Sequence, residues 1–321
     1  MDKHSIKIIY MGTPDFAVES LKALVEGGYN VVAVVTMPDK PAGRGHQIQY
    51  SAVKKYALSQ GLPVLQPERL KDPIFLEQLS SYEADLQIVV AFRMLPEVVW
   101  SMPRLGTFNL HASLLPQYRG AAPINWAVMN GDKETGVTTF MLQHEIDTGN
   151  IILQDKIQIA DDENVGSVHD RLMAMGAKLV TQTVDLIIES DTNEQPLLTI
   201  SQTTISKQLI EDLRPAPKIF KDTCVIDFSW DANRIYNHVR GLSPYPAAWI
   251  NKLPTQHPLG ELLTGAKVYK VEVVQHSERK GHIIVPCTDA YIDILELQLP
   301  GKKRMEAAAL LNGLKNSINP K

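Results

Sequence analysis

Three polar residues within positions 106–149 have side chains that could together catalyse acyl transfer. Asn109 and His111 are two residues apart in an apolar run, so in a β-strand both side chains point to the same face. Asp147 follows a second apolar run, residues 137–142. We therefore expect a carboxamide, an imidazole and a carboxylate to meet where neighbouring strands end.

Such a trio can transfer an acyl group without a covalent intermediate. The carboxamide N–H stabilises an oxyanion, the imidazole moves protons, and the carboxylate orients or charges the imidazole. The spacing is equally compatible with structural roles, in which Asn109 is a turn residue, His111 is a buried and hydrogen-bonded histidine, and Asp147 is a helix or turn cap. From the residues alone both interpretations stay open.

The length and composition indicate an ordinary globular protein with two domains. The chain has 321 residues, of which 44% are hydrophobic and 21% charged, and single cores rarely grow beyond about 250–300 residues. No run approaches the roughly 20 apolar residues of a membrane span, and the first residues do not resemble a signal peptide. Cys224 and Cys287 are too few for a disulfide framework, and no ligand cluster indicates a metal. We expect a cytoplasmic protein with free thiols.

The charge is distributed unevenly along the chain. Residues 207–321 carry 16 Lys and Arg against 12 Asp and Glu, a net charge of +4, whereas the chain as a whole has a net charge of −4. A basic second part joined to an acidic first part favours a polyanionic partner for the second part. Ordinary variation of surface charge is the alternative.

The apolar runs predict an α/β fold. Residues 6–11 read as a buried strand, Thr13 as a helix cap, Pro14 as the first helical residue, and residues 31–36 as the next strand,. A strand, a helix and a strand within about 30 residues form a βαβ unit with parallel strands. Further strands are expected at residues 85–92, 105–110, 137–142 and 151–159, a helix capped by Asn164 or Ser167, and an exposed loop at residues 38–45,.

The second part of the chain is predicted to be a small β domain. Short strand-like runs at residues 267–274, 282–286 and 291–299 alternate with Gly and Pro, which is typical of a small barrel. Residues 190–206 are polar and read as a linker. We therefore expect a Rossmann-like, mostly parallel sheet domain at residues 1–189 and a small β-barrel domain at residues 207–321.

One long motif adds a family resemblance to this interpretation. Residues 109–120 read N-x-H-x-S-L-L-P-x-Y-R-G and are followed by Asp147-Thr148-Gly149, which closely resembles the signature of the folate-dependent formyltransferases. Residues 11–17 and the loop at 38–45 look like the branch of that family that acts on methionyl initiator tRNA. The resemblance extends over nearly the whole chain, and it implies that the small barrel at residues 207–321 is an OB-like domain.

The resemblance implies an activity and a set of site residues. The formyl group of 10-formyltetrahydrofolate would move to the α-amine of methionyl initiator tRNA and give the N-formylmethionyl-tRNA used in translation initiation, without a metal and in a monomer. The catalytic residues would be Asn109, His111 and Asp147. The folate would contact Phe92, Met94, Ser113, Leu114, Leu115 and Pro116, and the tRNA would contact Arg44, Lys302, Lys303 and Arg304 in the loop and the C-terminal domain.

The sequence departs from the family pattern at one place near the expected folate pocket, and it leaves alternative functions open. The family commonly has a glycine after the aromatic residue at position 92, whereas Arg93 stands here in a stretch that is one residue shorter. Other acceptors of the formyl group would be glycinamide ribonucleotide, which leaves residues 207–321 unexplained, or an amino-sugar nucleotide, which leaves the loop at 41–45 unexplained. A non-catalytic folate- or RNA-binding module would not need all three catalytic residues.

Overall fold

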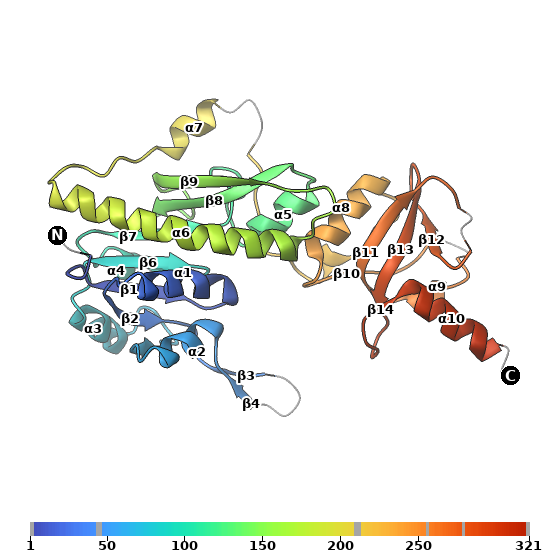
Figure 1. The fold of residues 1–321 in the computed structure, drawn as a ribbon, viewed down its shortest axis with the longest axis horizontal. Helices are drawn as coiled ribbons and strands as arrows, with labels where there is room; N and C mark the ends of the chain where they lie inside the picture. Colours follow the sequence, from blue (N-terminus) through green and yellow to red (C-terminus); the bar gives the residue numbers. More distant parts are fainter. Residues whose placement is uncertain (1–2, 43–46, 209–212, 255–256, 278–279, 319–321) are drawn as a thin grey trace. The chain divides into compact units, whose positions relative to one another are not determined.

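Strand β1 (Ile8–Gly12) lies inside a seven-stranded sheet with the order β5-β2-β1-β6-β7-β8-β9 (Figure 1). The computed structural model describes residues 3–42, 47–208, 213–254, 257–277 and 280–318. The strands from β5 to β7 are parallel, and β8 runs antiparallel to β7. The other strands of this sheet are β2 (Val31–Val35), β5 (Val64–Leu65), β6 (Leu86–Val90), β7 (Thr107–His111), β8 (Glu134–Met141) and β9 (Ile151–Gln158).

Helices cover both faces of this sheet. On one face, the Tyr10 hydroxyl of β1 donates to a carbonyl oxygen of α1 (Asp15–Glu26) at 2.6 Å, and Leu110 of β7 packs against α6 (Val165–Thr192) at Gly176. On the other face, α3 (Pro73–Ser81) and α4 (Glu97–Trp100) pack against β1, β2 and β6. Since side chains alternate along β7, Asn109 and His111 point to the face that α6 does not cover. Helix α2 (Ala52–Ser59) follows a two-stranded ribbon formed by residues 40–42 and 47–49.

The prediction of a loop at residues 38–45 is wrong in part. Lys40–Ala42 form β3, which pairs antiparallel with β4 (Gln47–Gln49). A proline is tolerated at position 41 because this two-stranded ribbon belongs to no larger sheet, so both of its strands are edge strands. The carboxylate of Asp39 anchors the start of the ribbon by accepting hydrogen bonds from Lys54 and Gln66.

The helix starts were predicted with mixed success. Asn164 caps α6, because its Oδ1 accepts a hydrogen bond from the Ser167 N–H at 3.0 Å. Thr13 does not cap α1, which begins only at Asp15. Pro14 has an extended ψ of 175° and makes no side-chain cap hydrogen bond, so the proline itself occupies the cap position.

The C-terminal part forms a five-stranded antiparallel sheet, with β14 paired to β13 at its side. The core of this part joins the sheet to α8 (Ala232–Leu242) through buried residues such as Ile235, Val239 and Ile294. This arrangement confirms the predicted fold class. Its strands are β10 (Ala248–Trp249), β11 (Lys267–Val274), β12 (Ile283–Pro286), β13 (Tyr291–Gln298) and β14 (Met305–Glu306), and its further helices are α9 (Gly260–Leu263), α10 (Ala307–Ile318) and the 3-10 turn Asp222–Cys224.

The chain divides into two units whose segments alternate along the sequence. Unit 1 consists of Met1–Gly120, Gly136–Ile157 and His169–Pro215, and unit 2 consists of Ala121–Thr135, Gln158–Val168 and Ala216–Lys321. Helix α5 (Pro123–Met129) therefore belongs to unit 2, where the Asn125 side chain donates to the Gly241 carbonyl of α8 at 2.8 Å. None of the described helices has the length and apolar character of a membrane span.

The stretch at residues 190–206 is partly built into unit 1. Helix α6 continues to Thr192. Ile200 exchanges two backbone hydrogen bonds with Ile151, each 2.8 Å long. Helix α7 (Gln202–Gln208) then begins at Gln202, which is buried and only 1% exposed. Residues 190–206 are therefore polar in composition and yet packed against unit 1 at specific positions.

Candidate functional site

His111 ends β7 and is 6% exposed. Its Nε2 lies 2.8 Å from the carbonyl oxygen of Tyr118. Since a carbonyl oxygen can only accept, Nε2 carries the proton of the neutral ring and Nδ1 carries the lone pair. Nδ1 faces Oδ2 of Asp147 at 4.0 Å, which is too long for a direct hydrogen bond. The pair therefore holds two acceptors ready for a shared donor.

Asp147 is held in an unusual backbone conformation. Its φ of 54° lies in the left-handed region, which few residues other than glycine adopt without cost. Its Oδ2 accepts a hydrogen bond from the Gly120 N–H at 3.0 Å. Two residues later, a Cβ at Gly149 would lie 1.6 Å from the carbonyl oxygen of Met141, so only glycine fits there.

A residue outside the predicted site, Gln202, holds this loop in place. Its Nε2 donates to the carbonyl oxygens of Asp147 at 2.9 Å and Gly149 at 2.8 Å. Its Oε1 accepts from Nη2 of Arg119 at 2.7 Å and from Nε at 3.1 Å. Both N–H groups and both lone pairs of the amide are used, which fixes its orientation. Gln202 thus ties the Asp147 loop to the loop that follows His111.

The sequence offered only a weak signal for Gln202. The residue lies in the polar stretch predicted to be a linker, and a single glutamine has no characteristic pattern. The apolar residue Ile205 was the available hint, since it packs against a small core of Leu115, Phe140 and Ile151. A segment that buries an apolar residue against the sheet also brings its polar neighbours to the sheet.

Asn109 is half-buried and lies between Val89 of β6 and Phe140 of β8. Within the part of the chain that the structure describes, no side chain or backbone group is hydrogen-bonded to its carboxamide. Asn109 and His111 occupy the same face of β7, as period two predicts. The carboxamide N–H groups are therefore available to a substrate.

The loop after His111 is held by its own hydrogen bonds. The Ser113 hydroxyl, which is not exposed, donates to the Gln117 carbonyl at 2.7 Å, and the Thr138 hydroxyl donates to the Ser113 carbonyl at 2.6 Å. Leu115 and Pro116 are buried, whereas Leu114 is half-buried. Of these four predicted folate contacts, Leu114 has the most accessible side chain. The folate-binding role of the loop stays a prediction.

The other predicted folate contacts lie after β6. Met94 is 74% exposed, whereas Phe92 is half-buried and packs against the core under α3. Between them, the Arg93 guanidinium donates to the carbonyl oxygens of Glu68, at 2.8 Å, and of Pro67. The arginine that replaces the family glycine therefore anchors this loop to the segment before α3.

The predicted tRNA contacts fall into three groups. Arg44 lies outside the described residues. Lys302 and Lys303 are exposed. Arg304 forms an ion pair with Glu296 and lies 4.2 Å over the Tyr269 ring, so its charge is already compensated. Across the described ranges, no three His, Cys, Asp or Glu side chains cluster as metal ligands would.

Comparison with known proteins identifies the family of this chain. Residues 5–184 match the family Formyl transferase, and residues 218–315 match Formyl transferase, C-terminal domain. The methionyl-tRNA formyltransferase of Parabacteroides distasonis is 60% identical over 98% of this chain and 98% of its own length. That of Bacteroides thetaiotaomicron is 57% identical over 99% of this chain and 98% of its own length.

A solved structure shares the fold at much lower identity. The N-formyltransferase from Helicobacter canadensis, in complex with folinic acid and dTDP-3-aminofucose, has a TM-score of 0.63 and is 20% identical. The match covers 94% of this chain and 100% of that one, and it supports the architecture alone. The two family matches and the full-length identity of 57–60% go further: the chain belongs to the formyl transferase family and, within it, to the methionyl-tRNA formyltransferases.

Proposed function

We propose that this protein transfers the formyl group of 10-formyltetrahydrofolate to the α-amine of methionyl initiator tRNA. The product is N-formylmethionyl-tRNA, which serves translation initiation in the cytoplasm, and the protein acts as a monomer. The observation that carries the proposal is the pair formed by His111 and Asp147, whose Nδ1 and Oδ2 atoms lie 4.0 Å apart at the C-terminal end of β7. It occurs in a chain that is 60% identical to a methionyl-tRNA formyltransferase over nearly its whole length.

The proposed chemistry uses the groups that the site leaves open. The acceptor ammonium loses one proton to solvent before its nitrogen can attack. As that nitrogen bonds to the formyl carbon it must lose a second proton, and Nδ1 of His111 has the free lone pair to accept it. Oδ2 of Asp147 stabilises the resulting imidazolium. The N–H groups of Asn109 donate to the oxyanion that forms on the formyl carbon. As the bond from that carbon to the folate nitrogen breaks, His111 returns the proton to the departing nitrogen.

The proposed binding roles follow the accessibility of the predicted residues. Met94, Phe92 and Leu114 offer apolar surface near the ends of β6 and β7 for the folate ring. The exposed Lys302 and Lys303 offer positive charge for the tRNA backbone,. Arg44 is proposed as a tRNA contact on the family resemblance of its loop alone.

A turnover assay with three acceptors tests the proposal. The full-length protein is mixed with 10-formyltetrahydrofolate and, separately, with methionyl initiator tRNA, glycinamide ribonucleotide or a dTDP-linked amino sugar. We expect formylated product with the tRNA only. Product with either small acceptor and none with the tRNA would assign the chain a different acceptor. No product with any acceptor would indicate a binding module.

A further inference from the structure

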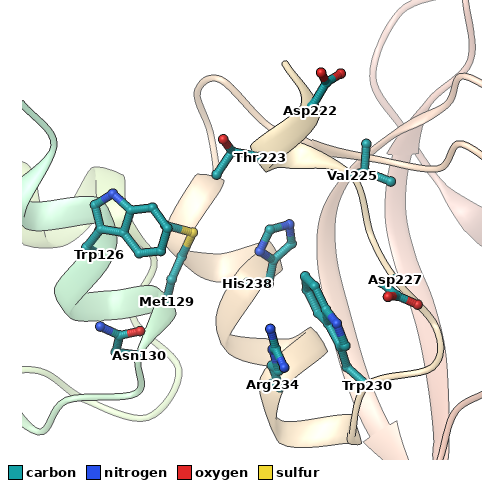
Figure 2. Close-up of a pocket in the computed structure, with 10 residues that line it drawn as sticks. All are labelled: Trp126, Met129, Asn130, Asp222, Thr223, Val225, Asp227, Trp230, Arg234 and His238. Carbon is teal, nitrogen blue, oxygen red and sulfur yellow. The ribbon is translucent and has the colours of Figure 1, made fainter. Parts of the chain in front are cut away.

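A cavity of about 470 Å³ lies within unit 2, between α5, the segment at residues 222–230 and α8 (Figure 2). None of its lining residues is among the predicted catalytic, folate-binding or tRNA-binding residues. Its volume falls in the range of small-molecule sites. The lining residues are Trp126, Met129, Asn130, Asp222, Thr223, Val225, Asp227, Trp230, Arg234 and His238.

The cavity has aromatic walls on two sides. Trp126 and Met129 of α5 form one wall, and Trp230 forms the other, with His238 between them in Figure 2. The Trp126 indole is fixed, because its N–H donates to the Pro217 carbonyl at 2.8 Å. The Arg234 guanidinium lies 4.0 Å over the Trp230 ring. Indole faces and a thioether suit a flat ring that inserts between them.

His238 contributes a buried acceptor to the cavity. The residue is 6% exposed, its Nε2 has no hydrogen-bond partner among the described residues, and its ring meets Trp230 edge-on at 5.1 Å. Burial lowers the pKa of His238 to about 4, so the ring is neutral near pH 7. Hydrogen bonds to the backbone of Cys224 and Val225 hold the ring proton, which leaves Nε2 with its lone pair. A ligand N–H would satisfy this atom.

The charged groups around the cavity disfavour a negatively charged ring inside it. Asp222 and Asp227 line it as exposed carboxylates, and Arg234 is the single cation among the lining residues. Asp227 already accepts hydrogen bonds from Ser229, so Asp222 is the freer carboxylate. Together with Nε2 of His238, it favours a ligand edge that donates hydrogen bonds and carries no negative charge.

We infer that this cavity binds a nucleobase that carries an exocyclic amino group, such as adenine or cytosine. The ring lies against the indoles, its amino group donates to Nε2 of His238 or to Asp222, and any phosphate stays outside near Arg234. The base belongs either to an unpaired nucleotide of the bound tRNA or to a free nucleoside. The first source rests on the proposed function, whereas the second does not.

Titration of the full-length protein with free nucleosides tests the site without any turnover. Adenosine, cytidine and uridine are added to protein labelled with 15N in tryptophan, and the indole N–H resonances are followed. We expect saturable shifts at Trp126 and Trp230 and none at Trp100 or Trp249, which lie outside the cavity. Uridine lacks the amino group and should bind at least tenfold more weakly. His238→Phe keeps a ring but removes the acceptor, so it should reduce the preference for adenosine.

Binding of methionyl initiator tRNA identifies the source of the base. Loss of one base–aromatic stack weakens binding by roughly 5- to 150-fold, and Trp230→Leu should weaken the tRNA complex by that factor. Glu261→Gln, a change of an exposed carboxylate on α9, is the control and should change little. If nucleosides bind but Trp230→Leu leaves the tRNA affinity unchanged, the site stands and its ligand is a free nucleoside.

Three outcomes would overturn the inference. The cavity is not a nucleobase site if no nucleoside shifts Trp126 and Trp230. It receives a protein side chain if N-acetyltryptophanamide shifts these resonances and nucleosides do not. Equal affinity for uridine and adenosine would show that the amino group is not recognised. A wild-type protein that fails to formylate tRNA but still binds adenosine would contradict the proposed function and leave the cavity site in place.

Discussion

The candidate site of unit 1 and the surface of unit 2 differ in how their polar groups are paired. In unit 1, Gln202 uses its whole amide, and Asp147 accepts the Gly120 N–H. Among the described residues, neither the carboxamide of Asn109 nor Nδ1 of His111 has a hydrogen-bond partner within 3.5 Å. In unit 2, Nε2 of His238 is buried and has no hydrogen-bond partner among the described residues, and the lysines at 302 and 303 are exposed.

This difference indicates a division of work between the units. A network whose members already have partners holds reacting groups in one geometry, which is what an oxyanion donor and a proton acceptor require. Groups without partners gain most from a ligand that supplies the missing contact. We therefore expect changes in unit 1 to lower the rate of formyl transfer, and changes in unit 2 to weaken binding.

The largest effect is expected for the open groups of unit 1. Asn109→Ala removes the proposed oxyanion donor and should lower kcat by about 100- to 1000-fold. His111→Ala should lower kcat at least as much, because it removes the proton acceptor. Steady-state rates with saturating tRNA and folate give kcat directly. A rate near that of wild type in either variant would remove that residue from the proposed mechanism.

The second effect is on stability and concerns the open group in unit 2. Burial, with a contribution from the charge of Arg234, lowers the pKa of His238 to about 4 from 6.5. Below pH 6.5 the His238 ring binds a proton in the unfolded chain but stays neutral in the folded state. The free energy of unfolding therefore falls as the pH falls from 6.5 towards 4. The loss should reach about 3 kcal/mol over this window.

Urea denaturation at a series of pH values measures this effect. Because many carboxylates also titrate in acid, the informative quantity is the difference between wild type and His238→Phe, which lacks the titrating group. The unfolding free energy of wild type minus that of His238→Phe should fall as the pH falls. Parallel curves would show that His238 takes up its proton at the same pH in the folded and unfolded states, so burial does not keep its ring neutral.

A smaller loss of rate is expected at Gln202, since it acts through Asp147. Gln202→Glu keeps the acceptor for Arg119 but removes both donors to the Asp147 loop. We expect kcat to fall by about tenfold, with the KM for folate unchanged, because the loop loses its left-handed geometry. Thr203→Val, at an exposed position on the same helix, is the matched control and should not change the rate.

Two further measurements separate positioning by Gln202 from a general loss of stability. In the background of Asp147→Asn, Gln202→Glu should cost little more, because residues that act as a unit are not additive. The Gly120 amide, whose acceptor is Asp147, should exchange its hydrogen faster in Gln202→Glu. Additive effects on kcat together with unchanged exchange at Gly120 would contradict the positioning role.

The sequence predicts the parts of this fold that depend on local patterns. Strands β1 and β7 follow from short apolar runs, and the same-face placement of Asn109 and His111 follows from period two. Contacts between residues that are far apart in the sequence leave no such local pattern. Gln202 contacts Arg119, which is 83 residues away, and Trp126 and Trp230 meet around one cavity only because α5 joins unit 2. The β3–β4 ribbon was missed because its proline and glycine content is typical of a loop.

The smallest effect is expected from the exposed lysines of unit 2, and it sharpens the separation of binding from chemistry. A lysine that neutralises a phosphate releases a counterion, so its loss reduces the slope of log K against log salt by about 0.9 for each contact. Lys302→Gln combined with Lys303→Gln should therefore reduce the salt slope of tRNA binding by up to about 2 and weaken binding a few-fold at moderate salt. The kcat at saturating tRNA should not change.

Removing the Arg304 ion pair by Arg304→Gln with Glu296→Gln is the matched control, since it alters two neighbouring charges without changing the net charge. Filter binding between 50 and 200 mM salt, a range that spans a large change in affinity, gives the slopes. If the Arg304→Gln, Glu296→Gln control reduces the slope as much as the lysine pair does, Arg304 contacts the tRNA despite its ion pair with Glu296. If kcat falls with the lysines, the chemistry of unit 1 is not independent of this surface.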